Sequence, residues 1–303
     1  MLALSHLCDL LVDPGSHPRG LRHLSAASSL VRAGPWLYLV ADDEHHLGML
    51  EAEGSPAGPV RLLRILSGDL PQDKDKRKAR KPDLEALALL PPAPSHPHGA
   101  LLALGSGSRT NRQHGFLLKL DATGGVEGDA RNIDLAGLYR PLRSDFSDLN
   151  IEGAFVTDGV LRLLQRANKA DTRNACIDYA LADVQEWITG RRNRPPGALS
   201  TTYFALGEVD SVPLGFTDGL ALPGGGWIFS AVAEDTADST QDGACTGSVI
   251  GWVNEAQELQ RLEPIAGAPK VEGIALAGPR RLWMVTDSDD PATASALWSV
   301  DLG

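Results

Sequence analysis

The stretch Val271-Glu272-Gly273-Ile274-Ala275 decides the fold of this chain, because four other stretches repeat its pattern. Each of three copies places one carboxylate before a small residue inside an apolar run: Asp83-Leu84-Glu85-Ala86-Leu87-Ala88, Asn150-Ile151-Glu152-Gly153-Ala154-Phe155 and Thr217-Asp218-Gly219-Leu220-Ala221. The weaker fifth copy, Ala27-Ser28-Ser29-Leu30-Val31, has hydroxyl groups in place of the acid. The copies recur at intervals of about 54 to 67 residues, and such a period predicts a repeat architecture.

Further apolar runs follow each copy. In the last unit, the turn Gly278-Pro279 precedes Leu282 to Val285, and Ala296 to Asp301 follows a polar loop. Short strands, about four per unit and joined by hairpin turns, are the signature of propeller blades. The sequence therefore predicts an all-β, five-bladed β-propeller that forms a single domain over residues 1–303.

Two features of the repeat bear on how the ring closes. The last unit ends at its third strand, so the segment His6 to Val12 is expected to supply the missing fourth strand. The intervals before Glu152 and Asp218 are wide, and a sixth, degenerate blade remains an alternative. Two stretches break the pattern: Asp73 to Asp83 is interpreted as a charged, solvated loop, and Tyr179 to Gly190 as a short helix.

Composition excludes several functional classes. The net charge of −11 among 303 residues argues against nucleic acid as a partner, since phosphate backbones require a basic surface. Cys8, Cys176 and Cys245 imply no disulfide framework. No apolar run approaches the ~18 residues needed to span a membrane, and Met1 to Val12 lacks the features of a signal peptide. We expect a cytoplasmic protein with no membrane partner.

The repeated acid suggests a metal site. The first strand of each propeller blade lines the central axis, so equivalent positions converge there. We therefore expect a shared set of ligands at Glu85, Glu152, Asp218 and Glu272, together with Ser28 or Ser29, of which we choose Ser29. Carboxylates in a narrow space either take up protons or hold a cation, and oxygen ligands alone favour a hard ion, with Ca²⁺ the first choice. The alternative is that each acid only binds backbone N–H groups of a neighbouring blade.

The loops after the second strands are expected to meet at one mouth of the channel. Acidic loops surround Asp43, Glu234 and Asp287, whereas two other loops are basic. Such a mouth suits a phosphorylated small molecule held by metal on one side and by cations on the other. The expected substrate-binding residues are Arg109, Arg112, His114, Arg166 and Lys169. Asp43 or Glu234 is the expected proton acceptor.

A resemblance to a known group supports this interpretation. Glu272-Gly273-Ile274-Ala275, followed by Leu282 to Asp287, resembles the phytase-like β-propellers, and so does Leu37 to Asp43. The chain is also similar to the five-bladed calcium-dependent apyrases, which hold a central calcium; Ser29 and Glu272 match two of their features. The resemblance implies the fold and the central cation, but it includes neither a complete apyrase nucleotide site nor the multi-calcium face of the phytases.

Three functions follow from the sequence. The first is a calcium-binding propeller that hydrolyses a phosphoester or phosphoanhydride with the help of the metal. The second is a non-enzymatic binding scaffold with a structural ion on its axis. The third is a metal-dependent lactonase or esterase, in which metal-bound water attacks a carbonyl group.

Overall fold

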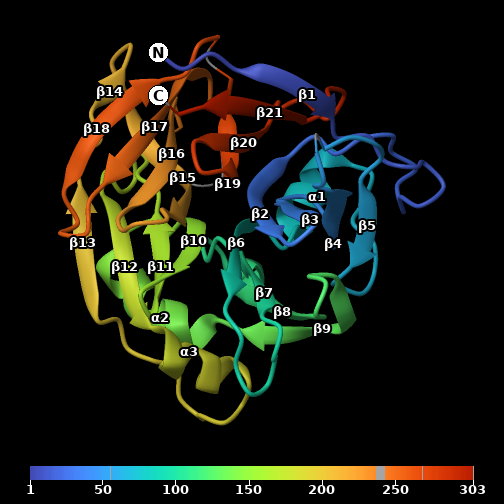
Figure 1. Ribbon diagram of the computed structural model, residues 1–303, viewed down its shortest axis with the longest axis horizontal. Coiled ribbons are helices and arrows are strands. Elements are labelled where there is room, and N and C mark those ends of the chain that lie inside the picture. Colours follow the sequence, from blue (N-terminus) through green and yellow to red (C-terminus); the bar gives the residue numbers. More distant parts are fainter. Residues whose placement is uncertain (55, 237–242, 268, 303) are drawn as a thin grey trace.

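The computed structural model is a ring of five antiparallel sheets around a central axis, and it describes residues 1–54, 56–236, 243–267 and 269–302 (Figure 1). The predicted five-bladed β-propeller is confirmed, and no sixth blade occurs in these residues. None of the helices in the described ranges has the length and apolar character needed to cross a membrane.

Each blade is a meander whose first strand lies at the axis. Blade 1 contains β2 (Ala27–Ala33), β3 (Trp36–Ala41), β4 (His46–Glu51) and β5 (Arg61–Arg64). Blade 2 contains β6 (Leu84–Leu90), β7 (Ala100–Gly105), β8 (His114–Leu120) and β9 (Val126–Asp134). Blade 3 contains β10 (Ile151–Thr157), β11 (Val160–Gln165), β12 (Asn174–Ala180) and β13 (Ser200–Phe204). Blade 4 contains β15 (Val212–Ala221), β16 (Trp227–Glu234), β17 (Cys245–Val253) and β18 (Leu259–Pro264), and the short β14 (Glu208–Val209) pairs with the start of β15. Blade 5 contains β19 (Val271–Gly278), β20 (Arg281–Thr286), β21 (Ala296–Asp301) and β1 (Ser5–Asp9).

The N-terminal strand closes the ring, as the sequence predicted. β1 pairs antiparallel with β21, from Ser5 opposite Ser299 to Asp9 opposite Ala296. The strand begins one residue before the predicted segment and ends earlier than Val12, which instead forms an isolated bridge with Val60 of blade 1. Closure therefore joins the first and last parts of the chain in one sheet and leaves the ring without an open end.

The wide intervals of the repeat hold helices rather than a blade. Helix α2 (Ala136–Asp145) lies between blades 2 and 3, and α3 (Leu181–Ile188) lies between β12 and β13, inside the stretch predicted to be helical. The interpretation of Asp73 to Asp83 as a solvated loop is wrong. Residues 74–80 form helix α1 (Lys74–Arg80), and Arg77 is buried because it faces the propeller.

The core lies between neighbouring blades. Both faces of each inner blade region are covered, so strands such as β16 are buried along their whole length. In blade 4, Phe216 and Phe229 pack edge to face with their ring centroids 4.8 Å apart. Gly251 on β17 makes room for this cluster, because a Cβ there would lie 2.1 Å from the Phe229 ring.

Every inner strand carries a β-bulge. In each pair, the register of the first strand slips by one residue against the second strand, which leaves one residue of the inner strand without a partner. The bulged residues are Ser28, Glu85, Glu152, Thr217 and Glu272. A bulge re-aims a side chain, and five bulges at one level of a closed ring re-aim equivalent side chains around one axis.

Candidate functional site

The bulges bring three glutamates to one cavity on the propeller axis. Glu85, Glu152 and Glu272 come from blades 2, 3 and 5, and all three line a cavity of about 140 Å³. Ten acidic and seven basic side chains line this cavity in total. The convergence predicted for these three acids is therefore present, and the excess of acids makes the cavity attractive to cations.

Ser29 and Asp218 do not lie at the position of the three glutamates. The predicted alignment of the repeats is therefore wrong by one residue in blades 1 and 4. The structural equivalents of the three glutamates are Ser28 and Thr217, because those residues occupy the bulges. Ser29 and Asp218 follow the bulges, and a shift of one residue along a strand turns a side chain to the opposite face. Neither residue lines the cavity.

Ser29 and Asp218 instead meet in the hub, by which we mean the buried centre of the ring where the inner strands lie together. Ser29 Oγ donates a hydrogen bond to Asp218 Oδ2 at 3.1 Å, and the backbone N–H of Ile274 donates to the same oxygen at 3.0 Å. The N–H of Gly219 donates to Oδ1. Burial raises the pKa of Asp218 well above its usual range. The residue thus links three inner strands, which is the structural role foreseen as the alternative for an individual acid.

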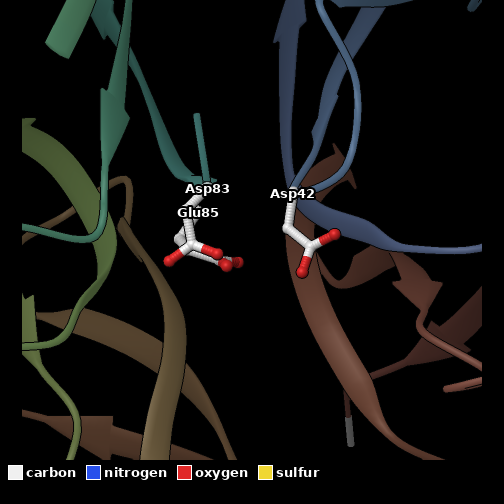
Figure 2. Close-up of side chains that lie close together, drawn as sticks. All are labelled: Asp42, Asp83 and Glu85. Carbon is white, nitrogen blue, oxygen red and sulfur yellow. The ribbon is translucent and has the colours of Figure 1, made fainter. Parts of the chain in front are cut away.

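One half of the cavity lies between blades 1 and 2. Asp42 follows β3, Asp83 precedes β6 and Glu85 lies on β6 (Figure 2). One carboxylate oxygen from each lies within 4.8 Å of the others. Lys81 Nζ contacts Asp42 and lies 2.9 Å from Asp83 Oδ1, while Arg112 Nη1 lies 2.8 Å from Asp83 Oδ2. Asp42 and Asp83 are thus neutralised in part by side chains of blade 2.

Glu85 differs from its two neighbours. It makes no hydrogen bond or ion pair with the described part of the chain. Burial, together with repulsion from Glu152 and the two aspartates, raises the pKa of Glu85 well above its usual range. Burial also raises the pKa of Asp42 to about 6. These shifts mean that negative charge is costly here unless a proton or an external cation compensates it.

The other half of the cavity is held by Arg166 and Lys270. Arg166 follows β11, and its guanidinium lies 2.5 Å from Glu234 Oε2, 3.3 Å from Glu152 Oε2 and 3.6 Å from Glu272 Oε1. These acids belong to three different blades, so one guanidinium bridges them. Burial works to raise the pKa of Glu234, but Arg166 and Lys270 outweigh it and hold the value below the usual range.

The structure divides the expected substrate-binding residues into two groups. Arg112 and Arg166 line the cavity. Arg109 is exposed beyond it, Lys169 pairs with Asp235 at the surface, and His114 faces Asn132 within blade 2. Arg109 and Lys169 lie in loops at the exposed surface and His114 begins β8, so none of the three lines the cavity.

Both residues expected to accept a proton line the cavity, and both are already paired. Asp43 Oδ2 accepts a hydrogen bond from Arg77 Nε at 2.9 Å and lies 3.4 Å from Arg19 Nη2. Glu234 also accepts a hydrogen bond from the backbone N–H of Gly243. The position of each carboxylate is therefore fixed by its partners.

Sequence reasoning missed most of the cationic lining. Lys74, Arg77 and Lys78 reach the mouth from α1, Lys81 follows that helix, and Lys270 stands just before β19. Their positions in the sequence could have indicated this role, because the charged run leads directly into the acidic stretch of blade 2 and Lys270 lies two residues before Glu272. The acids that line the cavity thus attract this neighbouring run of basic residues toward the axis.

The histidines of blade 1 lie away from the axial cavity. His45 and His46 border a separate small pocket with His17, Arg19 and Glu44. Glu44 Oε1 lies 2.9 Å from His17 Nε2 and 2.5 Å from Arg19 Nη2. Burial opposes the charge on Glu44, but these donors lower its pKa to about 2. This cluster anchors the segment before β2 to blade 1.

Comparison with known proteins identifies a family and several similar structures. The model of a family of unknown function, DUF6929, matches residues 23–302. No curated protein matches the chain. A luciferin-regenerating enzyme is similar with a TM-score of 0.47 and 10% identity, covering 93% of this chain and 92% of that chain. The glutaminyl cyclase of Myxococcus xanthus has a TM-score of 0.46 and 11% identity, covering 100% and 98%. The aldose sugar dehydrogenase of Streptomyces coelicolor has a TM-score of 0.47 and 12% identity, covering 99% and 98%. These likenesses concern the ring architecture and carry no argument about activity.

Proposed function

The chain belongs to the DUF6929 family, whose function is unknown, and we propose from its cavity that it binds a hard divalent cation, Ca²⁺ first, on the propeller axis. The observation that carries the proposal is the state of Glu85 and Glu272. Both face the cavity, Glu272 is 4% exposed, and neither of its carboxylate oxygens has a hydrogen-bond partner. A buried carboxylate in this state is costly unless a cation or a proton joins it.

The donor set fits such an ion. Asp42, Asp83 and Glu85 offer three oxygens that lie close together, and Glu152 and Glu272 face the same cavity. Ca²⁺ takes 6–8 oxygen ligands in tolerant geometry, so carboxylates from different blades can serve together. The Lys81 ammonium already contacts two of the three acids, so we expect the ion on the Glu85 side of that group.

We further propose metal-assisted hydrolysis of a phosphorylated small molecule at the mouth. A bound divalent ion would supply Lewis acidity toward a phosphoryl oxygen and lower the pKa of a bound water. Arg166 and Arg112 would hold the negative charge of the phosphoryl group, and Lys74 extends this cationic side outward. Asp43, fixed by Arg77, would accept the proton of the water. The segment from Glu272 to Asp287 resembles phytase-like propellers, and this resemblance supports a phosphate ester as substrate.

Metal binding is tested by elemental analysis and calcium titration calorimetry of the purified protein. We expect calcium to bind, and Glu85→Gln to weaken it on the order of tenfold or more, because the substitution keeps the shape and removes one ligand charge. The matched control is Glu127→Gln on β9, an exposed position that should leave the affinity unchanged. Protein that binds no divalent ion, or equal affinity in Glu85→Gln, would remove the proposal.

Hydrolysis is tested with a panel of phosphate esters and nucleoside phosphates in calcium and in chelator. We expect calcium-dependent release of phosphate that falls strongly in Asp43→Asn. Activity that survives chelation, or that is equal in Asp43→Asn, contradicts the assigned roles. If the protein turned over only lactones or carboxylic esters, the proposed reaction would instead be attack of water on a carbonyl group.

A second candidate, a structural ion in a binding scaffold, is favoured by the ion pairs that cross the ring. Arg166 of blade 3 contacts Glu234 of blade 4 and Glu272 of blade 5. Electrostatic contacts here join blades, and an axial ion would extend this connection. In that case chelation lowers the melting temperature, and no substrate in the panel is turned over.

A further inference from the structure

Lys270 lies in an unusual environment in the part of the cavity that blades 4 and 5 form. Its side chain is 10% exposed, and Nζ lies 2.7 Å from Asp289 Oδ1 and 3.3 Å from Asp287 Oδ2. Glu234 Oε1 and Glu272 Oε1 lie at 3.4 and 3.5 Å from the same nitrogen. Four carboxylates from blades 4 and 5 therefore surround one ammonium group.

An ammonium group cannot satisfy all four acids. It carries three directional N–H donors, and hydrogen-bond geometry is met only toward Asp287 and Asp289. Glu272, although buried, is left with both oxygens without a hydrogen bond. The four carboxylates therefore exceed what Lys270 can bind through directional hydrogen bonds. A spherical ion, whose attraction has no preferred direction, would fit this set of oxygens better.

The charges in this half of the cavity lead to the same conclusion. Five acids share two cations, Arg166 and Lys270; the acids are Glu152, Glu234, Glu272, Asp287 and Asp289. Ca²⁺ binds carboxylate oxygens at about 2.3–2.6 Å, so small side-chain rotations from the present Nζ distances would bring the four oxygens around Lys270 into range.

We propose that Lys270 is a tethered cation in a second divalent-cation position, and that it limits the cavity to one exchangeable metal ion. The ammonium then supplies the second positive charge beside a bound phosphoryl group, which a second metal would otherwise supply. The proposal rests on the proposed function in that both place hard cations in this cavity. The first position centres on Asp42, Asp83 and Glu85, the second centres on Asp287, Asp289 and Glu234, and Glu272 is counted in both.

The test is the number of calcium ions bound, measured by calorimetry and by elemental analysis after gel filtration. We expect Lys270→Ala to bind one more calcium ion per chain than the native protein, and Lys270→Arg to bind no extra ion because the charge remains. Lys169→Ala is the matched control, since its ammonium contacts Asp235 at the surface and its loss opens no buried position. An unchanged number in Lys270→Ala would overturn the proposal.

The same measurement separates this inference from the proposed function. If the native protein bound no calcium and Lys270→Ala bound one ion, the proposed ion at Glu85 would be ruled out and the second position at Lys270 would be supported. One ion in both proteins would support the ion at Glu85 and overturn the position at Lys270.

Stability supplies a second readout. Lys270→Ala should melt well below the native protein in chelator, because four acids, of which Glu234 and Glu272 are buried, lose a cation. The variant should regain most of the loss in calcium but not in sodium chloride of equal ionic strength. Methylammonium should restore part of the loss by entering the vacated position. A variant that stays unfolded in calcium would overturn the proposal, since the ion would then fail to replace the ammonium.

Discussion

Two layers of the same inner strands differ by one residue and have opposite chemistry. At the bulges, Glu85 and Glu272 face the cavity, and within the described residues both oxygens of Glu272 are buried without a hydrogen-bond donor. One residue later, Asp218 is sealed inside the hub and accepts hydrogen bonds from Ser29 and from backbone N–H groups. The comparison teaches that a shift of one residue along an inner strand decides whether a carboxylate meets hydrogen-bond donors or the cavity, and the proposed ligands are acids that lack such donors.

The largest expected effect breaks the hub layer. Asp218→Ala leaves the Ser29 hydroxyl and the N–H groups of Ile274 and Gly219 without an acceptor, so we expect a loss of about 3 to 5 kcal/mol in the free energy of unfolding. Urea denaturation measures it, with Asp129→Ala on the exposed face of β9 as the control. Calcium affinity per folded molecule should stay unchanged. Lost calcium binding in a protein of native stability would instead make Asp218 a ligand.

A second substitution breaks the cavity layer. Arg166→Met removes the guanidinium shared by Glu152, Glu234 and Glu272, and uncompensated buried charge costs about 3 kcal/mol or more. Unlike the loss in Asp218→Ala, this loss should be reduced by calcium, because a cation can replace a charge but cannot replace a missing acceptor. Equal responses of the two variants to calcium would contradict the distinction between the layers.

The pH dependence sharpens the comparison without any substitution. Burial raises the pKa of Asp42 to about 6 and that of Asp287 to about 7, above the ordinary value near 3.8. An acid with a raised pKa in the folded state contributes stability at low pH and loses it as pH rises through that value. In chelator, the free energy of unfolding should therefore fall between about pH 4, where the two acids ionise in the unfolded chain, and about pH 7, where Asp287 ionises in the folded protein.

Calcium should reverse that trend, because its ligands must be deprotonated and its affinity rises over the same range. Chemical denaturation at several pH values, with and without calcium, measures both slopes. Identical slopes in the two conditions would show that the acids and the ion are not linked.

The smallest expected effect lies at the mouth. Lys74 lines the cavity from the exposed side of α1, so Lys74→Ala should weaken binding of a phosphorylated ligand by about twofold, as expected for a screened surface charge. Arg109→Ala is the paired variant, and it should have no effect because Arg109 lies beyond the cavity. A larger effect at Arg109 would place the ligand on the hairpin loop instead.

Part of the site followed from the sequence alone. The repeated acid predicted that Glu85, Glu152 and Glu272 meet, and the loops predicted that Asp43, Glu234, Arg112 and Arg166 lie near them. The misplacement of Ser29 and Asp218 arose because Ser-Ser and Thr-Asp each offer two polar residues in succession, and only strand pairing shows which one occupies the bulge.

The sequence by itself determined the propeller ring, the closing strand and the level at which acids gather, because these depend on local apolar periodicity and on its recurrence along the chain. Only the tertiary structure decided which acids face the cavity and which cations meet them. A bulge changes the direction of a side chain within one residue, and Lys81, Lys270 and the folded α1 acquire their partners across loops and blades that are distant in the chain. Those contacts exist only after the ring has closed.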